Sequence, residues 1–145
     1  MTIVDIEISK FSLWQHYKGT VYEVLGVTST SIRCCIPQQP VSFKVRHSES
    51  LLILNVYQTR IHSEIDQLKL GFTPNFPGLD ILILVDPATS IINEHPHVIY
   101  HKYEDYSGEV WARPLGMFAD TLDQATVKQY NLTHNLRFKY IRTLS

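Results

Sequence analysis

The sequence has few cysteines, no long apolar run and no excess of charge of either sign. Its two cysteines, Cys34 and Cys35, are adjacent, a spacing that strains a bond between them, and unbridged thiols fit a reducing compartment. The longest apolar run, residues 81–85, is far too short to cross a bilayer. The first ten residues, MTIVDIEISK, lack the basic start of a signal peptide. We therefore expect a cytoplasmic protein without a membrane partner.

Charge and short motifs exclude several functional classes. Thirteen Lys and Arg face 14 Asp and Glu, for a net charge of -1, so no global basic field points to nucleic acid. The chain contains neither a Gly-rich phosphate loop nor the G-x-S-x-G turn of many hydrolases. We expect no cofactor.

Short strands dominate the pattern of apolar residues. Alternation of apolar and polar residues, or a short apolar run bounded by Gly or Pro, marks each of them. One stretch with near-helical spacing (Ile61, Ile65 and Leu68) predicts a short helix over 61–70. A helical turn is expected at 114–118, with a weak extension over 119–127. The expected strands are 4–9, for which a short helix is the alternative, and 21–25, 29–35, 43–45, 51–57, 79–85, 97–103, 109–113 and 137–141.

Three motifs in the chain have a counterpart in a known family. They are HYKG at 16–19, YEVLG at 22–26 and WARPLGMF at 111–118, with VIY at 98–100 between them and RF at 137–138. Together they resemble the bacterial family called domain of unknown function 1653, whose members have an HYKG opening, a V-x-Y strand and a W-x-R-P-x-x-M-F closing element. That family has no established activity, so the resemblance implies a fold and a surface patch rather than a reaction.

The resemblance is interrupted by a long insertion. The resemblance covers residues 14–31 and 93–142. Members of the family are about half as long as this chain, and their two halves are nearly contiguous. We therefore predict a mainly β single domain over 1–145, either an SH3-like small barrel or a strongly bent antiparallel sheet. The inserted segment, 32–92, would carry the short helix. The apolar runs 51–56 and 79–85 need covering, which a homodimer interface would provide.

Aromatic and basic residues gather in the motifs. Trp111 and Arg113 share a face of one strand, and arginine beside aromatic rings can stack or bind a carboxylate or phosphate. In the alternative interpretation, Trp111 fills the core with Tyr22 and Phe118, while Lys18 and Arg113 satisfy carbonyl groups or Glu23. The candidate ligand-binding residues are His16, Tyr17, Lys18, Tyr100, Trp111 and Arg113.

These residues favour a non-enzymatic binding module for a protein or a small anionic molecule. Arg113 would hold the anionic group, Trp111 and Tyr100 would stack on the ligand, and Lys18 would add charge. Aromatic and basic strands also occur in proteins that stack single-stranded nucleic acid, so a nucleic-acid-binding β-barrel is an alternative.

The histidines His95, His97 and His101 offer a second alternative. Their odd positions share one face of a strand, and three imidazoles can bind zinc. His95 and His101, however, lie roughly 20 Å apart on a straight strand, so only His95 and His97 could share an ion. Exposed strand histidines are the simpler expectation, and a metal-assisted enzyme is the alternative.

Overall fold

The computed structural model describes residues 11–28, 41–69, 79–105 and 108–144. The chain folds into two compact units. The split unit joins residues 1–27 to 97–145, and the inserted unit comprises residues 28–96. The split unit thus draws on the same two parts of the chain that carry the motifs. The strands expected at 4–9 and 29–35, and both cysteines, lie outside the described residues.

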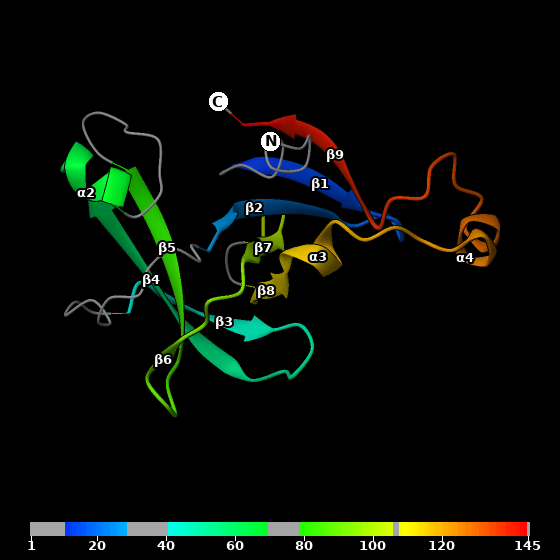
Figure 1. Ribbon diagram of the computed structural model, residues 1–145. Helices are drawn as coiled ribbons and strands as arrows, with labels where there is room; N and C mark the ends of the chain where they lie inside the picture. Colours follow the sequence, from blue (N-terminus) through cyan, green and yellow to red (C-terminus); the bar gives the residue numbers. More distant parts are fainter. Residues whose placement is uncertain (1–10, 29–40, 70–78, 106–107, 145) are drawn as a thin grey trace. The chain divides into compact units, whose positions relative to one another are not determined.

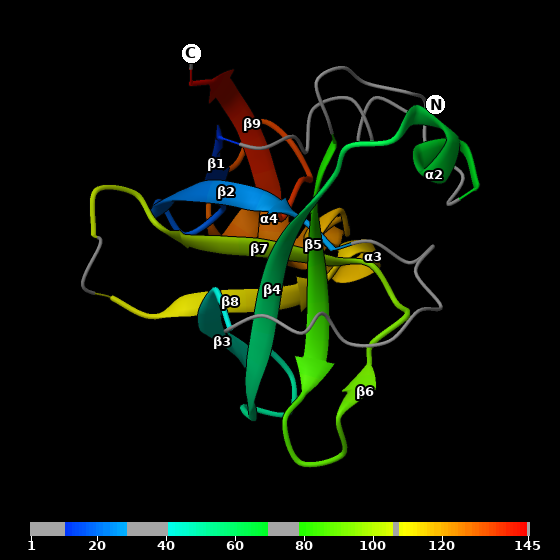
Figure 2. The ribbon, with the colours of Figure 1, turned by 90° about the vertical axis from the view of Figure 1, so that its left-hand side faces the viewer.

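The split unit is an antiparallel sheet whose strands come from both ends of the chain (Figure 1). Its strand order is β8-β7-β2-β1-β9. In Figure 2, β7 runs between β2 and β8, as this order requires. The strands are β1 (Ser12–His16), β2 (Val21–Val27), β7 (His97–Lys102), β8 (Val110–Pro114) and β9 (Phe138–Thr143).

Strand β1 was not expected from the sequence. Residues 12–14 are all buried, so the alternation that marks a half-exposed strand is absent. The Trp14 indole Nε1–H donates to the Ser12 hydroxyl oxygen at 2.9 Å, which satisfies the only polar atom of that buried ring. The aromatic stretch at 14–17 therefore belongs to a central strand and its turn.

The sheet of the split unit bends but does not close. Register shifts between Leu13 and Trp14, and between Val24 and Gly26, are the kind of irregularity that bends strands. The guanidinium of Arg113 on β8 lies 5.4 Å from the centre of the Phe138 ring on β9. Four strand spacings of about 4.8 Å would separate these outer strands in a flat sheet. Among the described strands β8 and β9 do not pair, so the expectation of a small closed barrel is wrong.

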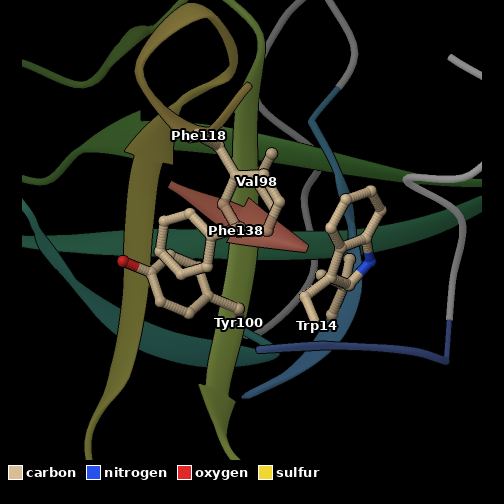
Figure 3. Packing of buried hydrophobic residues seen from close by; sticks show 6 residues of the cluster. Trp14, Val98, Tyr100, Phe118 and Phe138 are labelled. Carbon is tan, nitrogen blue, oxygen red and sulfur yellow. The ribbon is translucent and has the colours of Figure 1, made fainter. Parts of the chain in front are cut away.

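One face of this sheet carries an aromatic core, which we define as Trp14, Val24, Val98, Tyr100, Phe118 and Phe138. The rings of Phe118 and Phe138 stack with centroids 4.2 Å apart, and Trp14 meets Phe118 edge-on at 5.4 Å (Figure 3). Phe118 comes from the short helix α3 (Leu115–Phe118), which confirms the helical turn expected at 114–118. The core thus joins residues from both ends of the chain.

The extension expected over 119–127 is instead a separate helix, α4 (Gln124–Gln129). Helix α3 ends at Phe118, and Asp123 starts the new helix, because its side chain accepts a hydrogen bond from the Thr126 N–H at 2.7 Å and caps it.

The inserted unit has the strand order β6-β5-β4-β3. Its elements are β3 (Phe43–His47), β4 (Ile53–Ile61), α2 (Glu64–Lys69), β5 (Leu79–Asp86) and β6 (Ile91–Ile92). The apolar run 81–85 of β5 is buried within the chain itself. Among the residues of the two runs whose burial the structure describes, the exposed ones are 51–53, at the start of the first run.

Helix α2 confirms a helix within 61–70 but buries a different face from the expected one. Ile61 belongs to β4, so it does not share a helix face with Ile65 and Leu68. Ile65 and Leu68 are 65% and 59% exposed, whereas the polar Gln67 is fully buried. None of the helices in the described ranges is long and apolar enough to cross a membrane.

Candidate functional site

The turn between β1 and β2 presents the first group of site residues. The His16 N–H donates to the Thr20 carbonyl at 2.8 Å, and the Gly19 N–H donates to the His16 carbonyl at 2.8 Å. Gly19 has φ of +109°, a conformation that residues with a Cβ rarely adopt. The glycine of the HYKG motif therefore allows the tight turn that places Tyr17 and Lys18 beyond the end of β1.

His16 lies among three positive side chains. Its pKa is lowered from 6.5 to about 4, chiefly by partial burial, with the charges of Arg113, Lys18 and Arg137 acting in the same direction. These cations come from β8, from the β1–β2 turn and from the residue before β9. We call His16, Lys18, Arg113 and Arg137 the cationic cluster.

The His16 imidazole is neutral at pH 7, and its surroundings select one tautomer. Nδ1 accepts a hydrogen bond from the Lys18 N–H at 3.2 Å, so the ring proton resides on Nε2. The ring also packs edge-on against Phe138 with centroids 5.0 Å apart. His16 therefore offers a donor to an anion without carrying a charge of its own.

Arg113 is held in place by the aromatic core. Its Nε–H donates to the Tyr100 hydroxyl oxygen at 3.2 Å, and its guanidinium lies over the Phe138 ring. Burial raises the pKa of Tyr100, and the neighbouring Arg113 charge opposes that rise. Of the three guanidinium nitrogens of Arg113, Nε alone donates a hydrogen bond to a described residue. The two terminal nitrogens therefore remain for a ligand.

Arg137 and Tyr17 form the outer part of the cluster. The Arg137 guanidinium lies 5.9 Å from the centre of the Tyr17 ring, and Nζ of Lys18 lies 5.7 Å from it. Tyr130, which ends α4, packs edge-on against Tyr17 at 5.1 Å. Asp120 Oδ2 lies 3.8 Å from Arg137 Nη2, but this carboxylate is 54% exposed and neutralises Arg137 only weakly.

The structure separates the six candidate residues into two groups. His16, Tyr17, Lys18 and Arg113 come together in and beside the cationic cluster. Tyr100 is only 4% exposed and packs against Tyr22, Phe118 and Phe138, so its function is to hold Arg113. Trp111, opposite Tyr100 on β8, is partly buried against the aromatic core. Neither ring offers a ligand a fully open face.

Arg137 and Tyr130 were missed as site residues. The net charge of -1 shows no global basic field, yet the last acidic residue of the chain is Asp123. Residues 124–145 hold four of the 13 Lys and Arg and none of the 14 Asp and Glu. This charge asymmetry was the available signal. Its location beside HYKG depends on the pairing of β1 with β9, which no short-range pattern encodes.

The three histidines do not gather. His97 and His101 are 2% and 5% exposed, so the expectation of exposed strand histidines is wrong for both. His101 Nε2 lies 3.2 Å from Glu23 Oε1 in a buried cross-strand pair, whereas His95 is exposed in the loop before β7. Across the described ranges, no three His, Cys, Asp or Glu side chains are placed to hold a metal ion.

No family model, curated protein or solved structure matches the chain. Functional inference therefore rests on the geometry of the cationic cluster. That geometry combines three cations, a neutral imidazole donor and aromatic support. Chemically, it can bind an anion.

Proposed function

We propose that the protein is a non-enzymatic binding module that recognises an anionic group, carried by a protein or a small molecule, at the cationic cluster. The observation that carries this proposal is the convergence of three cations beside His16: the Arg113 guanidinium lies over Phe138, against which His16 packs, and Lys18 and Arg137 both lie over Tyr17. Positive side chains that repel one another in the free protein gain energy when an anion enters between them. The ligand class is thus set by charge rather than by apolar shape.

Each residue has a separate function in this proposal. Arg113, fixed by Tyr100 and Phe138, offers its terminal nitrogens in one orientation, which suits a carboxylate or phosphate. Arg137 and Lys18 add charge from the exposed side, and the His16 Nε2–H completes the donors. Tyr17 supports both Lys18 and Arg137 through its ring.

We further propose that the split unit has an SH3-like fold and belongs with the family of domain of unknown function 1653. The bent antiparallel sheet supports the first part, and the motifs at 16–26 and 111–118 support the second. In this interpretation, residues of the HYKG and W-x-R-P elements meet at the cationic cluster, so the motifs mark the binding surface.

The test is an NMR titration of the His16 ring with inorganic phosphate, citrate and a short oligonucleotide at low salt. Because a bound anion offsets the three cations, phosphate or citrate should raise the pKa of His16 from about 4. Arg137→Gln should weaken binding roughly tenfold, the size of one lost charge-assisted hydrogen bond. Arg137 is not a member of the aromatic core, so its loss should leave the core intact.

Lys139→Gln is the matched control. It removes the same charge from an exposed residue of β9, which follows Phe138 and pairs with Gln15 on β1. The proposal is contradicted if no anion moves the His16 resonance, or if Arg137→Gln and Lys139→Gln weaken binding equally. Tight binding of the oligonucleotide alone would favour a nucleic-acid-binding protein instead.

A further inference from the structure

Strand β9 has one sheet neighbour, β1, among the strands that the structure describes. The Arg137 carbonyl accepts from the Tyr17 N–H, and the Leu144 N–H donates to the Phe11 carbonyl, both on the β1 side. In an antiparallel pair, alternate residues direct their backbone groups toward the partner and the intervening ones away from it. Just before β9, Leu136 is bridged to Thr121 and the Arg137 N–H donates to the Asp120 carbonyl at 3.3 Å. The β9 edge is therefore a template for another strand from Phe138 to Thr143.

The side chains of this edge are positive. Lys139 and Arg142 are exposed on β9, Arg137 precedes it, and no acidic residue follows Asp123. Lysine on an edge strand commonly serves to prevent pairing with another sheet. A second copy of β9 would bring the same positive charges face to face, so the edge disfavours self-association. The same charges attract an acidic strand.

The edge begins beside the cationic cluster. His16 is the β1 partner of Phe138, at the start of β9, and Arg137 immediately precedes that residue. Arg142 lies about 13 Å further along, at about 3.3 Å per residue. An extended segment of five or six residues would therefore span the distance from Arg142 to the cluster.

We infer that the partner of this protein is an extended acidic peptide that adds to β9 as a further strand and places one carboxylate in the cationic cluster. This inference rests on the proposed function and names its ligand. Main-chain hydrogen bonds to β9 would supply affinity, and the charges of Lys139, Arg142 and Arg137 would set the preference for acidic residues. Binding should weaken steeply with salt.

The experiment uses the full chain, ¹⁵N-labelled, and a ten-residue peptide of alternating Glu and Thr. We expect the largest amide shifts, and hydrogen exchange slowed at least tenfold, at the β9 amides that point away from β1. A second peptide with the same sequence carries N-methyl groups on every other residue. It keeps the charge but loses the donors for strand addition, so it should bind at least tenfold more weakly.

Protein variants test the charge. Lys139→Glu with Arg142→Glu should abolish binding of the peptide, whereas Lys102→Glu, on an exposed residue of β7, should change it less than twofold. All three substitutions lie outside the cationic cluster, so inorganic phosphate should still move the His16 resonance in both variant proteins.

The outcomes separate the two proposals. If both peptides bind equally, or if the shifts lie away from β9 while phosphate still moves His16, strand addition is overturned and anion binding stands. If neither peptide nor phosphate nor citrate binds, both proposals fall. Dimerisation through β9 in sedimentation runs, with its amides protected in the free protein, would also overturn the inference.

Discussion

At the residue scale, His16 reports the electrostatics of the whole cluster. Its pKa is about 4 in the folded protein and 6.5 in the unfolded chain, so protonation favours unfolding. The contribution of His16 to stability is fully present above pH 6.5 and is lost as the pH falls toward 4. A shift of this size would correspond to about 3 kcal/mol without screening, and solvent around the half-exposed ring reduces that to about 1 kcal/mol.

We predict that His16→Asn flattens the pH dependence of the free energy of unfolding between pH 6.5 and 4 relative to the unmodified protein. Urea unfolding at several pH values measures this, and the other titrating groups cancel in the comparison. Equal pH dependence in the His16→Asn variant and the unmodified protein would contradict the assignment.

We also expect Arg113→Gln to raise the pKa of His16, because Arg113 is the charge that lowers it most.

At the element scale, the β1–β2 turn depends on one backbone conformation. Gly19→Ala meets no atom within 4 Å of the new Cβ, but the φ of +109° strains any residue with a side chain. We predict a loss of about 1–3 kcal/mol in thermal or urea unfolding. Gly116→Ala is the matched control: it also meets nothing within 4 Å and lies in helix α3, where alanine stabilises by about 0.5–1 kcal/mol. Equal effects at both positions would mean that the turn is not strained.

The cross-strand pair of Glu23 and His101 links β2 to β7. His101 Nδ1 faces the Asp105 carbonyl at 3.3 Å while Nε2 faces Glu23, so both ring nitrogens meet oxygen atoms. Because Glu23 would lose a buried partner, His101→Val should destabilise the fold by about 3–5 kcal/mol.

The double variant Glu23→Leu with His101→Val provides the control for that prediction. It removes both buried polar groups, so it should be less destabilised than His101→Val alone in urea unfolding. If the two substitutions instead add, the side chains are not coupled.

An element could be predicted from the sequence where its pattern of apolar and polar residues lies within the element itself. β2 and β7 were predicted from short-range patterns within their own residues, and β5 from its apolar run. β1 was missed because its first three residues are all buried. The buried face of α2 was wrong because Ile61 lies in β4, so spacing alone assigned it to the wrong element.

The site residues also differ in how far the sequence could predict them. His16, Tyr17 and Lys18 stood out as neighbours in the sequence, and Arg113 through the spacing of its motif. Arg137 could not be assigned to them, because its place depends on the pairing of β9 with β1. That long-range pairing is a property of the folded sheet rather than of either strand.

At the scale of the whole molecule, the split unit has its own core. Every member of the aromatic core comes from residues 1–27 or 97–145. Its two segments also end beside each other, because Val27 and Val98 are direct partners across β2 and β7. Partners in antiparallel strands have Cα atoms about 5 Å apart, a span that a two-residue turn closes.

We therefore predict that replacing residues 28–97 with Asn-Gly, which favours the type I′ turn, leaves a folded protein. Cooperative thermal unfolding and a dispersed NMR spectrum would show this, with upfield methyl resonances from Val24 and Val98 against the core rings. The pKa of His16 should stay within about half a pH unit of its value in the full chain, because Lys18, Arg113 and Arg137 all remain. An unfolded product would show that the aromatic core is insufficient by itself. A folded product with His16 near 6.5 would show that the cationic cluster needs the inserted unit, and binding would then have to be sought in the intact chain alone.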